Sequence, residues 1–269
     1  MGGTGHDGSA GSATRNLSAA RDLASELAAQ AGRLQVDRRS TVVVGGTKAH
    51  ANDFVSDVDL DSERLIVAGL SDAWPHDGIL AEEENSAPGS TVWRWVIDPL
   101  DGTRNYLSGA GPWSVCIALQ EQQTTRVAVV HDPAAGETFS AVSGEGALLG
   151  DSSLGTSGAT SLGEAILGLS FNPSPETKQR VGSLVAGMLP GVGDLRRVPA
   201  GLALSYVAAG RFDAAVLIDT KLWDVAAGLL IAAEAGAALH DEQFGGAAVI
   251  VATAPGLWPD LWKLAPAAP

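Results

Sequence analysis

The segment with the clearest chemical potential covers residues 95–106, WVIDPLDGTRNY, in which two aspartates follow an apolar run. Pro99 cannot donate to a strand ladder, so we expect the strand to stop at Asp98. Asp98 and Asp101 would then stand three residues apart at the end of a sheet. Gly102 and Thr103 would open a helical turn whose free N–H groups can face an anion. Carboxylates beside such amides suggest a cation between them, although a DPxDG turn can also merely join a strand to a helix.

Two other acidic segments could join this pair. A glutamate run at 82–84 follows an apolar pair at 79–80, and Asp224 opens an apolar helix after Trp223. The simpler interpretations are a solvated charge run for the glutamates and an N-cap for Asp224.

Five acidic residues also crowd positions 53–63. Asp57 and Asp61 are four residues apart on an expected helix and would repel each other unless a positive group lies near. Asp59 lies three residues after the expected cap Ser56, where a negative charge suits the helix dipole, so a purely structural role is as reasonable as a functional one.

Electrostatics favours a metal if these segments converge. Two carboxylates about 4 Å apart repel by roughly 4 kcal/mol at an effective dielectric of ~20, so a set of four needs divalent cations to persist. The five histidines match no metal-ligand spacing, and the single cysteine, Cys116, lies in an apolar run and is expected in the core. Oxygen ligands select hard ions, with Mg²⁺ first and Mn²⁺ or Ca²⁺ after it.

In order and spacing, these motifs resemble the inositol monophosphatase family of Mg²⁺-dependent, lithium-sensitive phosphatases, which shares its fold with fructose-1,6-bisphosphatase. The resemblance covers about residues 15–255 and begins with Lys48 and the run DFVSDVDLDSE at 53–63. It continues with Glu82-Glu83, DPLDGT at 98–103 and WDVAAG at 223–228. It implies an α/β (α+β) chain folded as a layered αβαβα sandwich.

The resemblance also implies two or three Mg²⁺ ions per subunit, with Mn²⁺ possible. Their ligands would be Glu82, Asp98, the carbonyl of Leu100, Asp101 and Asp224. Asp98 would be shared between the first two ions, and a weaker third ion would rest on Glu82. The choice of Glu82 depends on aligning Ala81 with a family glycine, so Glu83 is a lesser candidate.

The implied activity is hydrolysis of a phosphate monoester by direct in-line attack of a metal-activated water, without a phosphoenzyme. The catalytic roles would fall to Thr103, Asp59 and Glu82, with Asp59 polarising Thr103. The substrate-binding residues would be Gly102, Thr103, Asp101 and Ala200, with Lys48 as a lesser candidate.

The sequence departs from the family where the alcohol is recognised. The acidic residue seven positions before the WD aspartate is Leu217 here, and the Gly-Ser-Ala turn reads Val198-Pro199-Ala200. The expected substrate is a small phosphorylated alcohol of the inositol, cyclitol or sugar type. Histidinol phosphate or a 3′-phosphonucleotide are the alternatives within the family, and a catalytically silent metal- or phosphate-binding regulatory module is the alternative outside it.

Charge and composition restrict the partners. Lys and Arg total 17 against 31 Asp and Glu, a formal net charge of −14 over 269 residues. Such a surface repels nucleic acids and anionic membranes, so neither is an expected partner, and the resemblance implies a small phosphate ester instead. One cysteine and a start without a signal-peptide pattern favour the cytoplasm. The resemblance implies a homodimer.

The hydrophobic pattern predicts a disordered tail over 1–14, an α+β half over 15–150 with most metal ligands, and an α/β half over 151–269 that supplies Asp224, together one catalytic unit. Helices are expected from residue 17, over 56–70, 175–189, 200–209 and 224–235. Strands are expected at 92–97, 115–119, 127–130, 138–142, 166–169, 214–218 and 249–251.

Overall fold

Strand β4 (Trp93–Asp101) shows how the sequence builds the inner layers, because its apolar residues alternate in direction. Trp95 and Ile97 pack against the helices α1 (Leu17–Arg38) and α2 (Asp57–Ala73), whereas Val96 packs on the opposite face. The alternation predicted for 92–97 is confirmed, but the strand does not stop at Asp98, because it continues through a bulge and pairs again at Asp101. The structure is a computed structural model that describes residues 15–47 and 54–267, so the tail expected over 1–14 lies outside these ranges.

A seven-stranded sheet surrounds β4 in the order β3-β4-β5-β6-β7-β8-β9. β3 runs parallel to β4, and the later neighbours pair antiparallel. The remaining strands of this sheet are β3 (Gly78–Ala81), β5 (Ser114–Glu121), β6 (Thr124–Asp132), β7 (Glu137–Val142), β8 (Gly146–Leu149) and β9 (Ser152–Ser153).

A second sheet of five strands has the order β11-β10-β12-β14-β13. Its strands are β10 (Ile166–Phe171), β11 (Asp194–Arg197), β12 (Ala214–Ile218), β13 (Ala238–Phe244) and β14 (Ala247–Thr253). The first three are parallel, but β14 and β13 form an antiparallel hairpin beside β12. The sequence predicted β10, β12 and β14 in this half but not β13, which a turn at 245–246 joins directly to β14.

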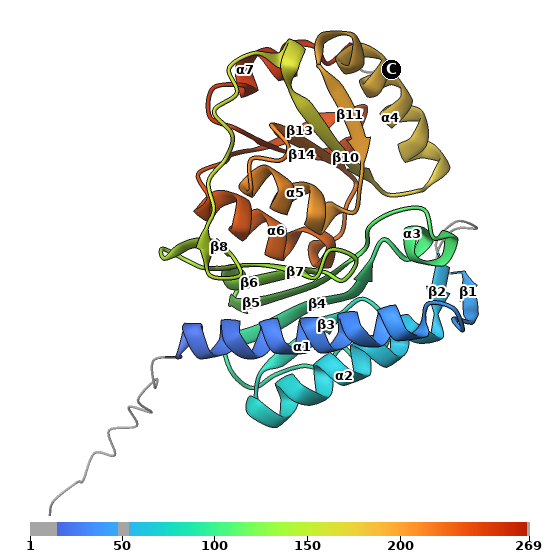
Figure 1. The fold of residues 1–269 in the computed structure, drawn as a ribbon, viewed down its shortest axis with the longest axis vertical. Coiled ribbons are helices and arrows are strands. Elements are labelled where there is room, and N and C mark those ends of the chain that lie inside the picture. Colours follow the sequence, from blue (N-terminus) through green and yellow to red (C-terminus); the bar gives the residue numbers. More distant parts are fainter. Residues whose placement is uncertain (1–14, 48–53, 268–269) are drawn as a thin grey trace, which may run out of the picture.

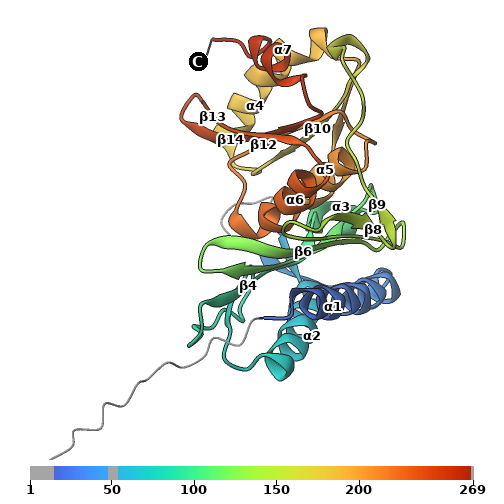
Figure 2. The ribbon, with the colours of Figure 1, turned by 90° about the vertical axis from the view of Figure 1, so that its left-hand side faces the viewer.

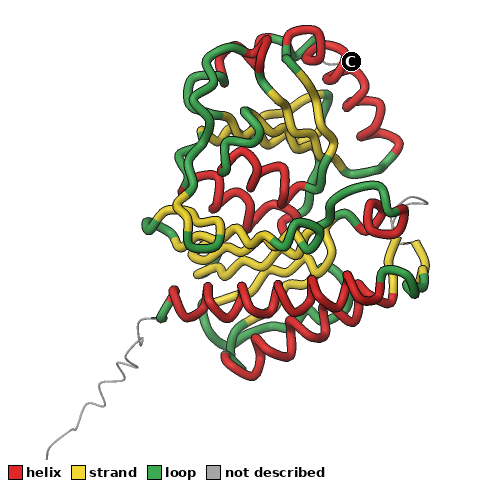
Figure 3. The backbone as a smooth tube through the Cα atoms, in the orientation of Figure 1, coloured by secondary structure: helices red, strands yellow, loops and turns green. Residues whose placement is uncertain are grey.

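The two sheets and the helices outside and between them form five layers (Figure 1). α1 and α2 cover one face of the large sheet, α5 (Ala200–Ala208) and α6 (Leu222–Glu234) fill the space between the sheets, and α4 (Pro175–Met188) and α7 (Trp258–Lys263) cover the far face of the small sheet. Figure 2 shows α5 and α6 between the sheets from the side, and Figure 3 shows the alternation of helical and strand layers. The expected αβαβα sandwich is confirmed.

Short elements complete the fold, some of them at the end of β4. The helix α3 (Thr103–Ser108) lies beside the ribbon of β1 (Val44–Thr47) and β2 (Phe54–Ser56), and 3₁₀ turns occur at Leu162–Glu164 and Leu189–Gly191. Within the described ranges, no helix combines the length and hydropathy that crossing a membrane requires.

Candidate active site

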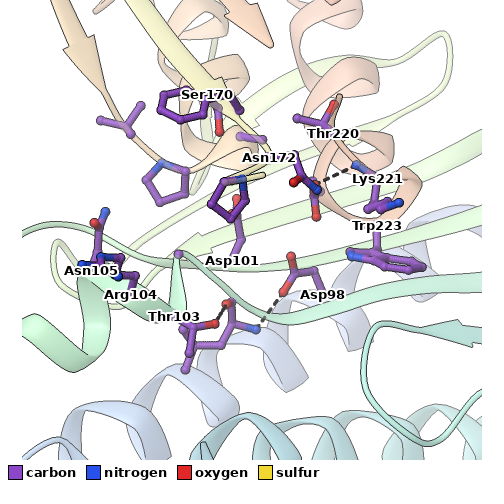
Figure 4. A pocket seen from close by; sticks show the side chains of 18 of the residues that line it. Asp98, Asp101, Thr103, Arg104, Asn105, Ser170, Asn172, Thr220, Lys221 and Trp223 are labelled. Atoms are coloured by element: carbon purple, nitrogen blue, oxygen red, sulfur yellow. Dashed lines mark hydrogen bonds between the residues drawn. The ribbon is translucent and has the colours of Figure 1, made fainter. Parts of the chain in front are cut away.

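A pocket of about 360 Å³ opens between the end of β4 and the loops that follow the parallel strands β10, β11 and β12. Ligands commonly bind beyond the carboxyl ends of parallel strands, and the volume suits a small ester. In Figure 4, Thr103 and Arg104 lie on one side of this pocket, and Lys221 and Trp223 lie on the other. The lining consists of Phe54, Glu82, Asp98, residues 100–105, 170–173 and 197–200, Thr220, Lys221, Trp223 and Asp224.

A β-bulge directs the two aspartates of β4 into the pocket. Asp98 pairs with Cys116 and Asp101 pairs with Ser114, so between these two pairs β4 advances by three residues and β5 by two. Such an extra residue bends a strand and re-aims its side chains. Gly102 follows with a φ of 93°, and a Cβ there would come within 2.7 Å of Pro199 Cγ, so this position requires glycine.

Three carboxylates, two from β4 and one from α6, are each fixed through one oxygen by a backbone amide. Leu100 N–H donates to Asp98 Oδ1 at 3.0 Å, Gly201 N–H to Asp101 Oδ2 at 2.8 Å, and Lys221 N–H to Asp224 Oδ2 at 2.8 Å. Asp224 is therefore at the third position of α6 and not its N-cap, which is Lys221. The simpler interpretation of Asp224 as an N-cap is wrong because α6 begins two residues before it.

The acidic side chains of the pocket influence one another electrostatically. Burial raises the pKa of Asp98 well above its ordinary value, and the charges of Glu82, Asp101 and Asp224 raise it further. Burial and then Asp224 raise the pKa of Asp101, although the hydrogen bond from Gly201 opposes this. Four carboxylates from three segments of the chain thus share one electrostatic site.

The donor set suits a hard divalent cation. Among the described residues, no group of three or more His, Cys, Asp or Glu has an arrangement that could hold a metal ion. This arrangement is expected without a cation, because the carboxylates then repel one another. The amides described above also orient one oxygen of each of the three aspartates. The set contains only carboxylates and the nearby Leu100 carbonyl, and the raised pKa values of Asp98 and Asp101 mark a site where positive charge would be stabilised.

The raised pKa of Asp98 makes a prediction for protein kept free of divalent cations. A carboxyl whose pKa is higher when folded favours folding while it is protonated, and this contribution is lost as pH rises through the folded-state pKa. We expect Asp98→Asn to raise the melting temperature in EDTA increasingly from about pH 4 to pH 8. Thermal unfolding of both proteins across this range checks it, and a difference that does not change with pH would contradict it.

Thr103 and Asp59 meet at the rim of the pocket. The Thr103 hydroxyl lies 3.0 Å from Asp59 Oδ1 and 3.1 Å from the Leu100 carbonyl oxygen, so its one proton can be donated to either. Asp59 is fully buried, and its Oδ2 accepts hydrogen bonds from the amide and hydroxyl of Ser56. The capping role and the contact with Thr103 are therefore combined in one side chain, one oxygen for each.

The sequence pattern of the inositol monophosphatase family matches residues 15–259. The chain belongs to the inositol monophosphatase family. It is accordingly a phosphoric monoester hydrolase by family.

Individual members of the family agree with this assignment. Inositol-1-monophosphatase SuhB of Mycobacterium tuberculosis is 38% identical over 264 residues, which cover 90% of this chain and 91% of the relative. The Nus factor SuhB of Xylella fastidiosa is 41% identical over 191 residues, covering 70% and 69%. The crystal structure of the extragenic suppressor protein suhB from Bartonella henselae has a TM-score of 0.85 at 30% identity and covers 91% of this chain and 98% of its own.

Most of the site residues expected from the family resemblance line one pocket. They are Glu82, Asp98, Leu100, Asp101, Gly102, Thr103, Ala200 and Asp224. Glu83 is not part of the lining, which favours Glu82 of the two glutamates. Lys48, the other lesser candidate, lies outside the described residues.

Other acidic residues of the family motif at 53–63 have structural roles. Arg38 at the end of α1 donates hydrogen bonds to both Asp57 and Asp61 and supplies the positive group that this pair requires. Glu63 is fully buried and accepts the amides of residues 83, 84 and 85, each at 2.8 Å. It thereby fixes the loop directly after Glu82, a role that sequence reasoning missed.

The turn that departs from the family pattern still supports the site. Pro199 caps α5, and the amide of Gly201 reaches Asp101. A Cβ on Gly201 would lie 2.4 Å from Cys116 Sγ, so the close approach depends on glycine. Cys116 is 1% exposed, as expected for a core residue.

Gln35 supports the bulge from behind, and no sequence signal indicated it. Its amide nitrogen donates to the Pro99 carbonyl oxygen at 2.7 Å and to Ser62 Oγ at 3.1 Å, and its oxygen accepts from Trp113 Nε1 at 2.8 Å. Gln35 is fully buried, and it is 64 residues away in sequence from Pro99, whose carbonyl it holds. We call these hydrogen bonds of Gln35 the clamp.

We expect Gln35→Met to lower the free energy of unfolding by about 2–4 kcal/mol, because it leaves the buried Pro99 carbonyl and Trp113 N–H without partners. The activity per folded molecule should fall as well, since the bulge carries Asp98 and Asp101. Urea unfolding and steady-state rates measure both effects. Gln30→Met, on the exposed part of the same helix, is the matched control, and equal behaviour of the two variants would refute the clamp.

Proposed function

We propose that this chain is a Mg²⁺-dependent phosphatase that hydrolyses the phosphate monoester of a small alcohol by direct in-line attack of water. The observation that carries the proposal is the contact between Thr103 and Asp59 beside the anchored Asp98 and Asp101. A protein that only bound metal or phosphate would not need this hydroxyl–carboxylate pair. The pair therefore favours an enzyme over a silent regulatory module.

The metal ligands in this proposal are Glu82, Asp98, the Leu100 carbonyl, Asp101 and Asp224. When bound there, divalent cations would supply the positive charge that a phosphate dianion requires and would lower the pKa of water. The protein contributes the prearranged carboxylates, three of them oriented by backbone amides.

Thr103 orients the attacking water in this proposal. When its proton is donated to Asp59 Oδ1, the lone pairs of Thr103 Oγ1 can accept a hydrogen bond from water at the pocket rim. As the water loses its proton to the Thr103 hydroxyl, positive charge develops on that hydroxyl, and the Asp59 carboxylate stabilises it. In this proposal the amides of Gly102 and Thr103, at the start of α3, would hold the phosphate oxygens.

The proposed substrate class is a phosphorylated cyclitol or sugar, in keeping with relatives named inositol-1-monophosphatase. We further propose a cytoplasmic homodimer. Light scattering after size exclusion tests the dimer, and a monomeric mass would contradict it.

A panel of phosphate esters tests the proposed activity. Inositol 1-phosphate, glycerol 2-phosphate, histidinol phosphate and a 3′-phosphonucleotide would each be offered with Mg²⁺ and with EDTA, and released phosphate measured. We expect Mg²⁺-dependent release from at least one ester and none with EDTA. No release from any ester, with Mg²⁺ binding retained, would favour the silent module.

Lithium provides a separate test of the second cation site. Because the family resemblance implies lithium sensitivity, we expect inhibition at millimolar LiCl, with matched KCl as the control for ionic strength. Phosphate release measures it. Full activity in lithium would argue against the assignment of Asp101 and Asp224 to a shared cation.

A further inference from the structure

The acidic contact that the family resemblance places seven positions before Asp224 is missing from the pocket. Leu217 occupies that position, is fully buried on β12 and packs in the layer of α5 and α6. The next carboxylate along the chain is that of Asp219, but neither residue lines the pocket. Asp219 therefore cannot replace the missing contact, and its surroundings indicate a different role.

Asp219 has a left-handed backbone conformation, with a φ of 53°. Within the described part of the chain, Gln122 is the one other residue besides glycines that has a positive φ. Aspartate tolerates this conformation better than most residues, but the conformation persists only where surrounding contacts hold it. At Asp219 the chain leaves β12 and turns toward α6, so the contacts of this residue determine the direction of the turn.

Hydrogen bonds to two other elements fix Asp219. Its N–H donates to the Ala248 carbonyl oxygen at 2.9 Å, and the N–H of Ala248 donates to Asp219 Oδ1 at 3.1 Å. The hydroxyl of Thr177, a buried residue, donates to Asp219 Oδ2 at 2.7 Å. Because Ala248 lies on β14 and Thr177 on α4, one side chain joins the end of β12 to both elements.

The turn that begins at Asp219 leads directly to a proposed cation ligand. Thr220 and Lys221 follow it, and both line the pocket (Figure 4). The N–H of Lys221 donates to Asp224 Oδ2 at 2.8 Å. Since only Thr220 separates Asp219 from Lys221, the position of the Lys221 amide depends on how the chain leaves Asp219. The direction of the Asp224 carboxylate thus depends on a turn that Asp219 fixes.

The same contacts reach a second loop of the pocket. Thr177 lies in the first turn of α4, which follows the lining residues 170–173. The N–H of Asn172 in this loop also donates to the Ile218 carbonyl oxygen, at 3.1 Å, directly before Asp219. The loops after β10 and β12 are therefore tied together next to the pocket.

We propose that Asp219 is a positioning residue for the divalent-cation site, because it holds the turn whose Lys221 amide orients Asp224. The inference rests on the cation site of the proposed function, in which Asp224 is a ligand. Removing a group that supports a metal ligand typically lowers metal affinity by about ten- to a hundredfold. Loss of the Asp219 contacts should therefore weaken cation binding, whereas a purely structural role would change the stability alone.

Mn²⁺ binding to variants of the full chain tests this role. Asp219→Gly removes the side-chain contacts, while glycine keeps the left-handed φ without strain. We expect it to raise the Kd for Mn²⁺ about tenfold, measured without any ester by the electron paramagnetic resonance of free Mn²⁺. Asp219→Asn should restore most of the affinity, because asparagine tolerates this conformation and its amide can accept from Ala248 and donate to Thr177.

A second variant tests the same contact without changing Asp219. Thr177→Val keeps the shape of the side chain but removes the hydroxyl that donates to Asp219 Oδ2. It should also raise the Kd for Mn²⁺, and it decides the question if Asp219→Gly does not fold.

Asp213→Gly is the matched control, because Asp213 directly precedes β12 at the end opposite to Asp219. Both aspartates are half-buried and fixed in a similar manner, since Asp213 Oδ2 accepts the Ile166 N–H at 2.8 Å and Oδ1 accepts the Ser157 hydroxyl. Asp213 does not line the pocket. The melting temperature of the metal-free protein should fall in both glycine variants, but Mn²⁺ affinity should fall only in Asp219→Gly.

The possible results separate the inference from the proposed function. Unchanged Mn²⁺ affinity in Asp219→Gly and Thr177→Val, an equal loss in Asp213→Gly, or no restoration by Asp219→Asn would overturn the inference. Failure of the wild-type chain to bind Mn²⁺ would overturn the proposed cation site and the inference with it. A wild-type chain that binds Mn²⁺ but hydrolyses no ester would overturn the proposed activity, while the binding results would still decide the role of Asp219.

Discussion

Asp98→Asn is expected to lower phosphate release by at least about a thousandfold, because Asp98 would be shared by two cations that together neutralise the phosphate. The side chain is 2% exposed and lies where the charges of Glu82, Asp101 and Asp224 converge. Asparagine keeps an oxygen that can accept the Leu100 amide, so the bulge should remain. The loss would therefore be electrostatic and not a consequence of misfolding.

Steady-state rates and circular dichroism of the same preparation distinguish these causes. Asp61→Asn is the matched control, since Asp61 also belongs to the acidic part of the family motifs but pairs with Arg38 and Arg64 outside the pocket. It should keep its activity. If Asp98→Asn retained more than a small fraction of the wild-type rate, Asp98 would not be a shared ligand.

Thr103→Val is expected to reduce kcat by about a hundredfold or more while changing KM little. Valine matches threonine in shape but removes the hydroxyl that Asp59 polarises at 3.0 Å. Cation and phosphate binding depend on other groups, so the ground-state complex should still form. The expected pattern is a loss in kcat alone, because the hydroxyl acts on the attacking water.

Thr103→Ser serves as the rescue variant, because it retains the hydroxyl at the same position. Initial rates over a range of ester concentrations give both constants. A large increase in KM for Thr103→Val with unchanged kcat would assign Thr103 to substrate binding. Equal loss in the serine and valine variants would assign it to packing.

Local patterns in the sequence were sufficient for the five longest helices and for the central strands of both sheets. The alternation around Trp95 and Ile97 predicted β4, and Ser56 was correctly expected to begin α2, because both signals depend on neighbouring residues only. The five layers came from the family resemblance. β13 was missed because its exposed and half-buried residues carry little hydrophobic signal, and α7 because it is a short helix.

The site residues that belong to local sequence motifs were predictable. The residues that support them from distant parts of the chain were not. The segment at 98–103 and Asp224 are visible in the sequence, but Gln35 reaches the Pro99 carbonyl only through packing of α1. The place of Arg197 depends on the end of a strand that was not expected. Long-range contacts of this kind leave no periodic trace along the chain.

The central claim is that Glu82, Asp98, Asp101 and Asp224 jointly hold divalent cations, and locating Mn²⁺ tests it most directly. Crystals grown with MnCl₂ and measured at the manganese edge would show each ion by its anomalous signal. The account predicts manganese peaks among these four carboxylates and beside the Leu100 carbonyl, with the Asp98-bridged ions absent in Asp98→Asn. An active wild-type enzyme whose crystals show manganese elsewhere, or none among these residues, would contradict it.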